Sequence, residues 1–474
     1  MRPFEFDNYD DEFDDAPRRR KDLDDELKEL KEKLKDGSGG ITNTEALDEI
    51  VSYYFENEKY EDALHFVDIL LTFIPYSADT WLRKGMILNN LQKYDDALAS
   101  YEKALGLNPV DPEVLINKGI ALDNLNRHDE ALACFDSALQ IDPNNEDALY
   151  NRGITLEKMD EFEEAVKIFQ FIVEGNPGHK DAWYELGYCY DSLNRLEDSL
   201  RCYDEHISQD PYNYNAWYNR GIVLNRMGSY SKSIESYDMV LAIKEDFPAA
   251  WYNKGNAYAN MGRLHDAINC YKQTLRHDPK DVPALHNMGN AYEELGQFEE
   301  AIKSFDEVLK LDPNHCESYF GRGSCYDSLQ QYRKALRDYN KAISLSRNCI
   351  ELWYAKADLL YNMGRVRDSV ICYRTVTKLD PKNSQAWFDC GETLFELGYY
   401  RQALKALNRC IELNQNCADA FFTRARVQFA LHQADEAVES LRISFQLDPE
   451  KQKEFEKEFP SIPSLRDLAN LLKR

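Results

Sequence analysis

Apolar residues along the chain recur at the spacing of two short helices, and the pattern is clearest in the segment 248–281. Trp251, Gly255 and Tyr258 lie three or four residues apart, so they share one face of a predicted first helix. Gly262 follows, and glycine suits the left-handed backbone that often ends a helix. A second apolar series then begins and stops before a proline. The segment therefore predicts a helix–turn–helix pair.

The same pattern returns every 34 residues. A fixed period of this size is typical of a repeat array, in which each unit contacts its neighbours and the chain presents a long surface. We number repeat positions from Pro248 as position 1, so that the recurring proline stands at position 32. The prolines that mark the period are Pro75, Pro109, Pro143, Pro177, Pro211, Pro279, Pro313, Pro381 and Pro449.

Three columns of the repeat predict how the two helices pack. Position 8 is nearly always glycine, although glycine inside a helix costs about 1 kcal/mol relative to alanine. We therefore expect the second helix to approach the first closely at this position. Position 20 is small and position 24 is usually aromatic, so small residues face large ones across the pair. The position-8 glycines are Gly85, Gly119, Gly153, Gly187, Gly221, Gly255, Gly289, Gly323 and Gly391.

With Trp at position 4, Gly at 8, Tyr at 11, Ala at 20, an aromatic at 24 and Pro at 32, the unit resembles the tetratricopeptide repeat. The resemblance covers about residues 44–451, or twelve units. It implies an all-α fold, a right-handed α-solenoid of helix–turn–helix repeats, and a concave groove lined by the first helices. One departure is position 7, often leucine in the family but lysine or arginine here, as in Lys254. We expect these side chains to cover the helix seam with their stems while the charge reaches water.

The sequence predicts three regions. Residues 1–43 are expected to be an acidic, disordered segment with a short charged helix and a Gly-Ser-Gly-Gly linker. Residues 44–451 hold the repeats, whose first and last units are atypical, as terminal units that face solvent are. Residues 452–474 are expected to form short capping helices.

Composition narrows the partners and the compartment. A formal net charge of −27 disfavours nucleic acid, which is held by clustered Lys and Arg. The one basic run, Arg18 to Lys21, is interpreted as pairing with the acids around it, with a short targeting or docking patch as the alternative. No apolar stretch reaches membrane-spanning length, and residues 1–15 lack the pattern of a signal peptide. We therefore expect a cytoplasmic protein without membrane insertion.

Catalytic and metal-binding patterns are missing from the sequence. The eleven cysteines include no CxxC pair and recur at fixed repeat positions, which indicates apolar packing rather than a metal site. The nine histidines are scattered over different positions, and no phosphate-binding loop or nucleophile motif occurs. The prediction is a protein that is not an enzyme and uses no metal and no cofactor.

Asparagines recur on the face of the first helix opposite the apolar stripe. Asparagine is a poor helix former, so its repeated use suggests a role other than helix stability. Its amide offers donors and an acceptor that match a peptide backbone, and a ladder of amides would hold an extended chain. The alternative is that repeat duplication simply copied the residue. The candidate binding residues are Asn117, Asn151, Asn219, Asn253 and Asn287 at position 6, Asn256 and Asn290 at position 9, and Asn124 and Asn260 at position 13.

Two neighbouring columns refine this hypothesis. Position 5 is mostly aromatic, and Tyr218 and Tyr252 complete the candidate peptide-binding set, although such rings more often pack against neighbouring repeats. Position 2 is mostly acidic, which favours a neutral or basic partner segment. The near absence of Lys and Arg at positions 2, 5 and 6 also argues against the clamp for a terminal carboxylate found in some relatives.

The leading hypothesis is a non-catalytic protein–protein interaction scaffold that binds an extended, neutral-to-basic peptide in its concave groove. One alternative is a regulatory or adaptor subunit that presents a partner to an enzyme acting in trans. Another is that the acidic tail, Met1 to Asp15, folds back as a pseudo-ligand and modulates binding. The sequence does not choose the partner, the pathway or the oligomeric state.

Overall fold

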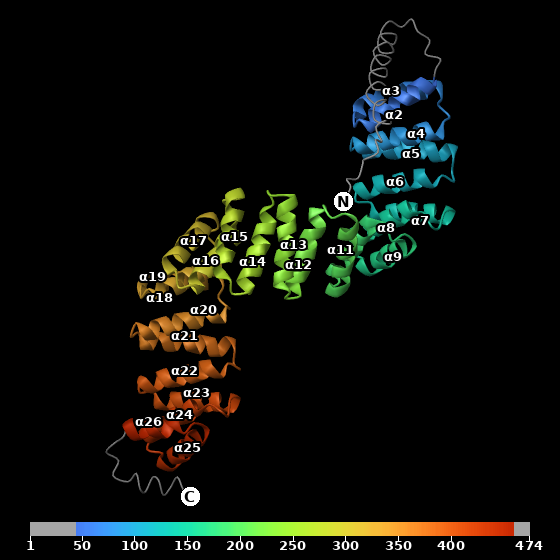
Figure 1. Ribbon diagram of the computed structural model, residues 1–474. Helices are drawn as coiled ribbons and strands as arrows, with labels where there is room; N and C mark the ends of the chain where they lie inside the picture. Colours follow the sequence, from blue (N-terminus) through green and yellow to red (C-terminus); the bar gives the residue numbers. More distant parts are fainter. Residues whose placement is uncertain (1–43, 459–474) are drawn as a thin grey trace, which may run out of the picture. The chain divides into compact units, whose positions relative to one another are not determined.

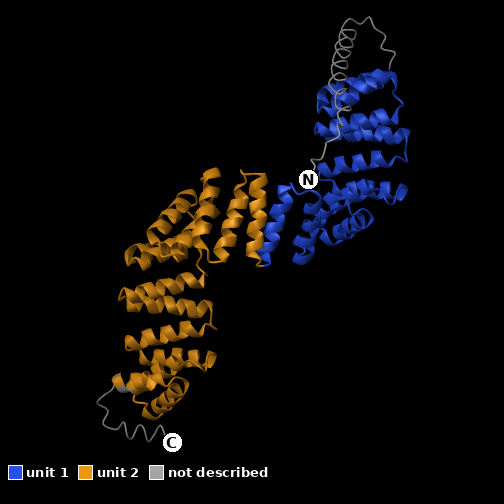
Figure 2. Ribbon diagram, in the orientation of Figure 1, with its two compact units in different colours: residues 1–227 blue, residues 228–474 orange. Residues whose placement is uncertain are grey.

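The structure is a computed structural model that describes residues 44–458, in which 25 helices and no strand occur (Figure 1). The predictions for residues 1–43 and for helices beyond residue 458 lie outside the described part of the chain. The helices fall into two compact units, residues 1–227 and 228–474, which Figure 2 colours separately. Among residues 44–458, no helix has the length and apolar character that a membrane crossing requires.

The described part of unit 1 contains eleven helices. They are α2 (Thr44–Glu56), α3 (Tyr60–Phe73), α4 (Ala78–Asn90), α5 (Tyr94–Leu107), α6 (Pro112–Asn124), α7 (His128–Ile141), α8 (Glu146–Lys158), α9 (Phe162–Gly175), α10 (Lys180–Ser192), α11 (Leu196–Gln209) and α12 (Tyr214–Arg226).

The described part of unit 2 contains fourteen helices. They are α13 (Tyr230–Ile243), α14 (Pro248–Asn260), α15 (Leu264–His277), α16 (Val282–Glu294), α17 (Phe298–Leu311), α18 (Cys316–Ser328), α19 (Tyr332–Leu345), α20 (Ile350–Asn362), α21 (Val366–Leu379), α22 (Ser384–Glu396), α23 (Tyr400–Leu413), α24 (Ala418–Ala430), α25 (Ala434–Leu447) and α26 (Glu450–Glu458).

The even-numbered helices α2 to α24 are the predicted first helices, at repeat positions 1–13, and the odd-numbered ones are the second helices, at positions 17–30. Local chemistry sets their ends. Before several first helices a polar side chain accepts a hydrogen bond from a free N–H, as Asp281 does from Ala284 at 2.7 Å. At the far end, Gly262 adopts a φ of +71°, and the N–H of Arg263 reaches back to the carbonyl of Tyr258 at 2.9 Å. The predicted helix end at Gly262 is confirmed.

The glycine and aromatic columns pack as expected. A Cβ placed on Gly255 would lie 2.7 Å from Cε1 of Tyr271, and one on Gly85 would lie 2.3 Å from Cε1 of Tyr101. Such distances are too short for any Cβ, so only glycine lets the position-24 ring reach the backbone of the first helix. The all-α repeat fold predicted from the sequence is therefore confirmed.

Several position-7 cations also pair with an acid of the preceding repeat, a contact that the repeat columns did not predict. Lys254 Nζ lies 5.1 Å from the ring centre of Trp251, at position 4 of the same helix, and pairs with Asp238 of the preceding second helix. Arg220 Nε pairs in the same register with Asp204 at 2.6 Å. Both pairs lie at exposed positions, so these charges pair with the acids at position 25 of the preceding repeat while remaining near water. The other position-7 cations with a position-25 acid are Lys84, Lys118, Arg152 and Arg322.

The last pair is covered by α26. Phe455 is 3 % exposed, and its ring lies 6.5 Å from that of Phe422 and 6.0 Å from that of Phe445. This apolar contact closes the end of the described array, as expected for a terminal cap.

Candidate functional site

The candidate surface is the face of the first helices that carries positions 2, 5, 6, 9, 12 and 13, which we call the first-helix face. Within unit 1, consecutive first helices touch from α4 through α12, and within unit 2 they touch from α14 through α20 and again between α22 and α24. Each unit therefore presents its own continuous stretches of this face.

A fixed register links neighbouring first helices on this face. The side-chain amide of Asn219 donates to the hydroxyl of Tyr184 at 2.9 Å, and that of Asn287 donates to the hydroxyl of Tyr252 at 3.1 Å. In both cases position 6 of one repeat bonds to position 5 of the repeat before it. Asn256 joins the second pair, because its Oδ1 accepts from Asn287 at 3.0 Å. The structure thus brings together Asn256, Asn287 and Tyr252 of the candidate set.

The residue at position 5 of the preceding repeat determines which group accepts the hydrogen bond of the position-6 asparagine. The register partners of Asn117 and Asn151 are Leu82 and Ile116, which have no hydroxyl. Both amides donate instead to a carbonyl one turn back in their own helix, Asn117 to Glu113 at 2.9 Å and Asn151 at 2.8 Å. Asn219 and Asn287 therefore link neighbouring repeats, a role that was not predicted for them from the sequence.

The remaining candidates are spread along the face. Asn290 lies 3.1 Å from Nε2 of His286 and is exposed, as are Asn124 and Asn260. Asn253 and Tyr218 are half-buried at positions 6 and 5. The ring of Tyr252 packs 6.1 Å from that of Tyr271, which supports the packing interpretation of the position-5 column.

Asn287 bonds to the preceding repeat and Asn117 bonds within its own helix, so replacing each with alanine is expected to lower the free energy of unfolding by different amounts. Asn287→Ala is expected to lower the free energy of unfolding by about 1 kcal/mol, because it removes two hydrogen bonds to the preceding repeat. Asn117→Ala is expected to change it by less than about 0.5 kcal/mol, since only a bond within its own helix is lost. Urea unfolding followed by circular dichroism measures both values. Equal costs for the two variants would contradict the assigned register.

Half-buried carboxylates on the first-helix face were missed by the sequence analysis. Burial, with Glu185 close by, raises the pKa of Glu157 to about 8. Burial also raises the pKa of Glu185 to about 7, and the Tyr150 hydroxyl donates to that carboxylate at 3.3 Å. The sequence held a signal for Glu157, because acids recur at position 12, whereas Glu185 stands at position 6. The position-12 acids are Asp123, Glu157, Asp191, Glu293 and Asp327.

Unit 2 also has half-buried carboxylates on its first-helix face. One of them is Asp389, whose pKa is raised to about 7 by burial and by the nearby Glu392. The hydroxyl of Tyr354 donates to Asp389 in the same position-5 to position-6 register. Burial likewise raises the pKa of Glu392. In the described residues, no group of three His, Cys, Asp or Glu side chains is arranged to hold a metal ion.

The raised pKa of Glu157 predicts a pH-dependent stability. Between the ordinary glutamate range and about pH 8, the folded state holds a proton that the unfolded state releases, so stability falls as the pH rises. Glu157→Gln is expected to raise the free energy of unfolding by about 1–2 kcal/mol at about pH 8.5 and to change it little at about pH 5.5. Urea unfolding at both pH values tests this, with Glu235→Gln, at an exposed helix position, as the control. A pH-independent effect of Glu157→Gln would contradict the assignment.

Family models match most of the described residues. Residues 232–458 match the model described as "Cilia and flagella-associated protein 70 C-terminal domain". One tetratricopeptide repeat model matches residues 82–146, 150–213 and 192–248, and another matches residues 125–170. Among curated proteins, no match is found.

Solved structures similar to the chain include three proteins. YrrB, titled a tetratricopeptide repeat protein with an unusual peptide-binding site, is 22 % identical with a TM-score of 0.36, covering 40 % of this chain and 97 % of its own. A chain of the Cut9–Hcn1 hetero-tetramer of the APC/C is 14 % identical with a TM-score of 0.37, covering 92 % and 96 %. The C-terminal part of a repeat protein from Cytophaga hutchinsonii is 18 % identical with a TM-score of 0.45, covering 50 % and 97 %.

The repeat columns, the paired helices and the repeat models agree with one another. Repeats of this kind imply a protein–protein interaction scaffold. The chain belongs to the tetratricopeptide repeat superfamily.

Proposed function

We propose that the chain is a non-catalytic scaffold whose first-helix face binds an extended, neutral-to-basic peptide segment of a partner protein. The observation that carries the proposal is the column of acids at position 2, every one of which is exposed. Exposed acids along one face attract a cationic chain and repel an anionic one. The position-2 acids are Asp79, Glu113, Asp147, Asp181, Glu317, Glu351 and Asp419.

Asn117 and Asn151 are the asparagines best suited to contact such a peptide. Each uses one N–H on a carbonyl of its own helix and makes no other hydrogen bond with a described side chain or backbone group. The amide oxygen and the second N–H remain for a peptide group. The amides of Asn219 and Asn287 already donate to tyrosine hydroxyls, so fewer of their hydrogen-bonding groups remain for a peptide. We therefore expect these two residues to contribute less to binding.

Charge selectivity tests the proposal. Two short fluorescein-labelled peptides of equal length, one alternating lysine with serine and one alternating glutamate with serine, are titrated with the full chain by fluorescence anisotropy. We expect the lysine peptide to bind and its affinity to fall as salt rises from about 50 to about 300 mM, because salt screens exposed charges. Equal binding of both peptides, or preference for the glutamate peptide, would refute the proposal.

The amide contribution is tested separately. Asn117→Ala with Asn151→Ala is expected to weaken binding of the lysine peptide about fivefold to tenfold, in line with the loss of one or two hydrogen bonds. Asn144→Ala with Asn314→Ala, at exposed positions in turns between helices, is the matched control. If the two double variants bind equally well, the asparagines are not peptide contacts.

A further inference from the structure

A cavity of about 360 Å³ opens on the first-helix face of unit 1, between α2, α4 and the start of α6. This volume lies within the range of about 300–1,000 Å³ that ligand pockets usually have. Its lining divides into two kinds of side chain. Apolar residues are Val51, Phe55, Leu82, Met86 and Ile87, and charged or polar residues are Ser52, Glu56, Asp79, Arg83, Asp111 and Glu113.

The cavity lies where the tyrosine column is interrupted. In later repeats of unit 1, a position-5 tyrosine packs against the position-24 ring of its own repeat, as Tyr184 does on Tyr203 at 5.8 Å. Its hydroxyl then reaches position 6 of the next repeat. Position 5 of α4 is Leu82, which is too short to do either. The space that a tyrosine would fill is left open to the face.

The rim of the cavity is acidic. Glu56, Asp79 and Glu113 are exposed, and no ion pair joins their carboxylates to another described residue. The one cation in the lining, Arg83, is already bound to Asp48 at 2.7 Å and to the Ser52 hydroxyl at 3.1 Å. The cavity therefore combines an apolar floor with three carboxylates that form no ion pair within residues 44–458.

The repeat that supplies α4 also contains a buried hydroxyl without a partner among the described residues. Tyr101 is 0 % exposed, and its hydroxyl has no hydrogen-bond partner in the described part of the protein. In two other repeats the equivalent hydroxyl bonds to position 9, as Tyr271 does to Asn256 at 2.8 Å. Position 9 of this repeat is Met86, which lines the cavity. The Tyr101 hydroxyl therefore lacks the position-9 oxygen that receives the equivalent hydroxyl in those two repeats.

We propose that this cavity is the anchor point for an arginine side chain of the partner peptide, an inference that rests on the proposed function. The aliphatic stem of arginine covers apolar surface while its guanidinium reaches polar groups, which matches this floor and rim. The planar guanidinium donates to several carboxylates at once and stacks on aromatic rings such as Phe55.

The test uses a short labelled peptide with a central Arg-Leu-Arg flanked by glycine and serine, and the same peptide with citrulline in place of arginine. Citrulline keeps the shape of arginine and removes its charge. The full chain is expected to bind the arginine peptide about tenfold more tightly, a difference that two or three close charge pairs supply. Equal affinities for the two peptides would overturn the proposal.

Two variants localise the effect. Asp79→Asn with Glu113→Gln is expected to reduce arginine-peptide affinity about tenfold, whereas Asp95→Asn with Glu163→Gln, the same charge change at exposed positions of second helices, leaves it within about twofold. Leu82→Tyr fills the cavity with the side chain that other repeats carry, so it is expected to abolish the arginine preference without loss of stability. Equal losses from both charge variants, or an unaffected Leu82→Tyr protein, would refute the cavity as the anchor.

Two further outcomes are distinguishable. If the full chain binds neither the arginine peptide nor the lysine–serine peptide, the proposed function itself fails. If it binds both but the cavity variants have no effect, only the anchor fails. Replacing Arg18, Arg19, Arg20 and Lys21 with glutamine should leave affinity unchanged. A tenfold increase would show that the chain's own basic run occupies the cavity, which would overturn its assignment to a partner.

Discussion

Replacing Phe305 with alanine is expected to lower the free energy of unfolding by about 3–5 kcal/mol. The ring is 0 % exposed and lies between two glycines of successive first helices. A Cβ on Gly289 would meet Cε1 of Phe305 at 2.7 Å, and one on Gly321 would meet its Cζ at 2.6 Å. One ring thus holds together its own helix pair and the next repeat, and alanine would leave a cavity at both contacts.

Urea unfolding monitored by circular dichroism measures this cost. Phe171→Ala is the matched control, because Phe171 is 52 % exposed and its loss is expected to cost less than about 0.5 kcal/mol. Similar costs for the two phenylalanines would mean that the position-24 ring does not join the repeats.

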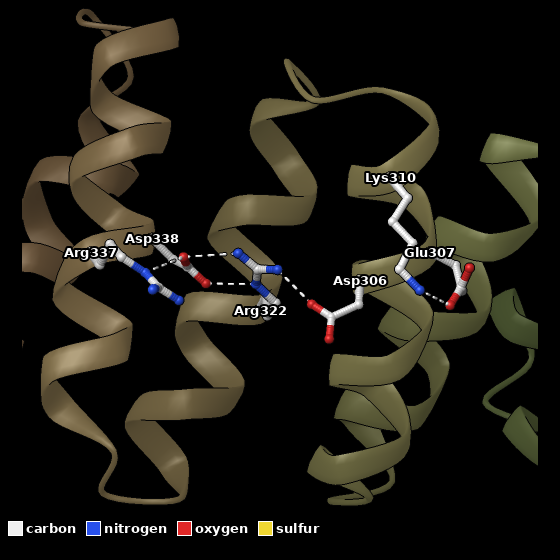
Figure 3. A network of polar contacts seen from close by, with 6 residues as sticks. All are labelled: Asp306, Glu307, Lys310, Arg322, Arg337 and Asp338. Carbon is white, nitrogen blue, oxygen red and sulfur yellow. Dashed lines mark hydrogen bonds and ion pairs between the residues drawn. The ribbon is translucent and has the colours of Figure 1, made fainter.

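Asp338→Ala is expected to destabilise the protein by about 3–5 kcal/mol, because it leaves the Arg322 guanidinium without its buried partner. Figure 3 shows Arg322 between two carboxylates of neighbouring second helices. Its Nε lies 2.7 Å from Asp338, whose side chain is 2 % exposed, and its Nη1 lies 2.5 Å from Asp306, whose side chain is 41 % exposed. Burial lowers the pKa of Arg322, but the hydrogen bonds to Asp338 and Asp306 outweigh this effect and raise it. Because arginine keeps its proton in proteins, the guanidinium is expected to stay charged when Asp338 is removed.

Asp306→Ala supplies the control on the same guanidinium. Since Asp306 is exposed, its loss is expected to cost no more than about 1 kcal/mol. Urea unfolding of the two variants gives the comparison. If Asp306→Ala lowered the free energy of unfolding as much as Asp338→Ala, burial of the carboxylate would not explain how much each ion pair with Arg322 stabilises the protein.

The sequence predicted the architecture because the fold repeats the same local solution. The glycine at position 8 and the ring at position 24 are each read directly from the columns, and the contact of Gly255 with Tyr271 confirms them. What the columns did not reveal is how consecutive repeats contact each other. That information lies in pairs such as Asn219 with Tyr184, where position 6 depends on position 5 of the preceding repeat.

The sequence predicted which helix face is the candidate surface, but not the hydrogen bonds, pKa shifts and cavity found on it. Asn117 and Asn287 share a repeat position, yet their hydrogen bonds differ because Leu82 and Tyr252 stand before them in the register. The raised pKa of Glu157 depends on burial against the next helix, which a single column does not show. The cavity beside Leu82 likewise depends on which residue stands at position 5 of one particular repeat, where most other repeats have an aromatic residue.

Hydrogen–deuterium exchange of the full chain, with and without the lysine–serine peptide, tests the central claim that the first-helix face is the binding surface. We expect slower exchange in first helices such as α4, α6 and α8 when peptide is bound, and unchanged exchange in the second helices α5 and α7. Protection confined to the second helices, with α4, α6 and α8 unaffected, would contradict it.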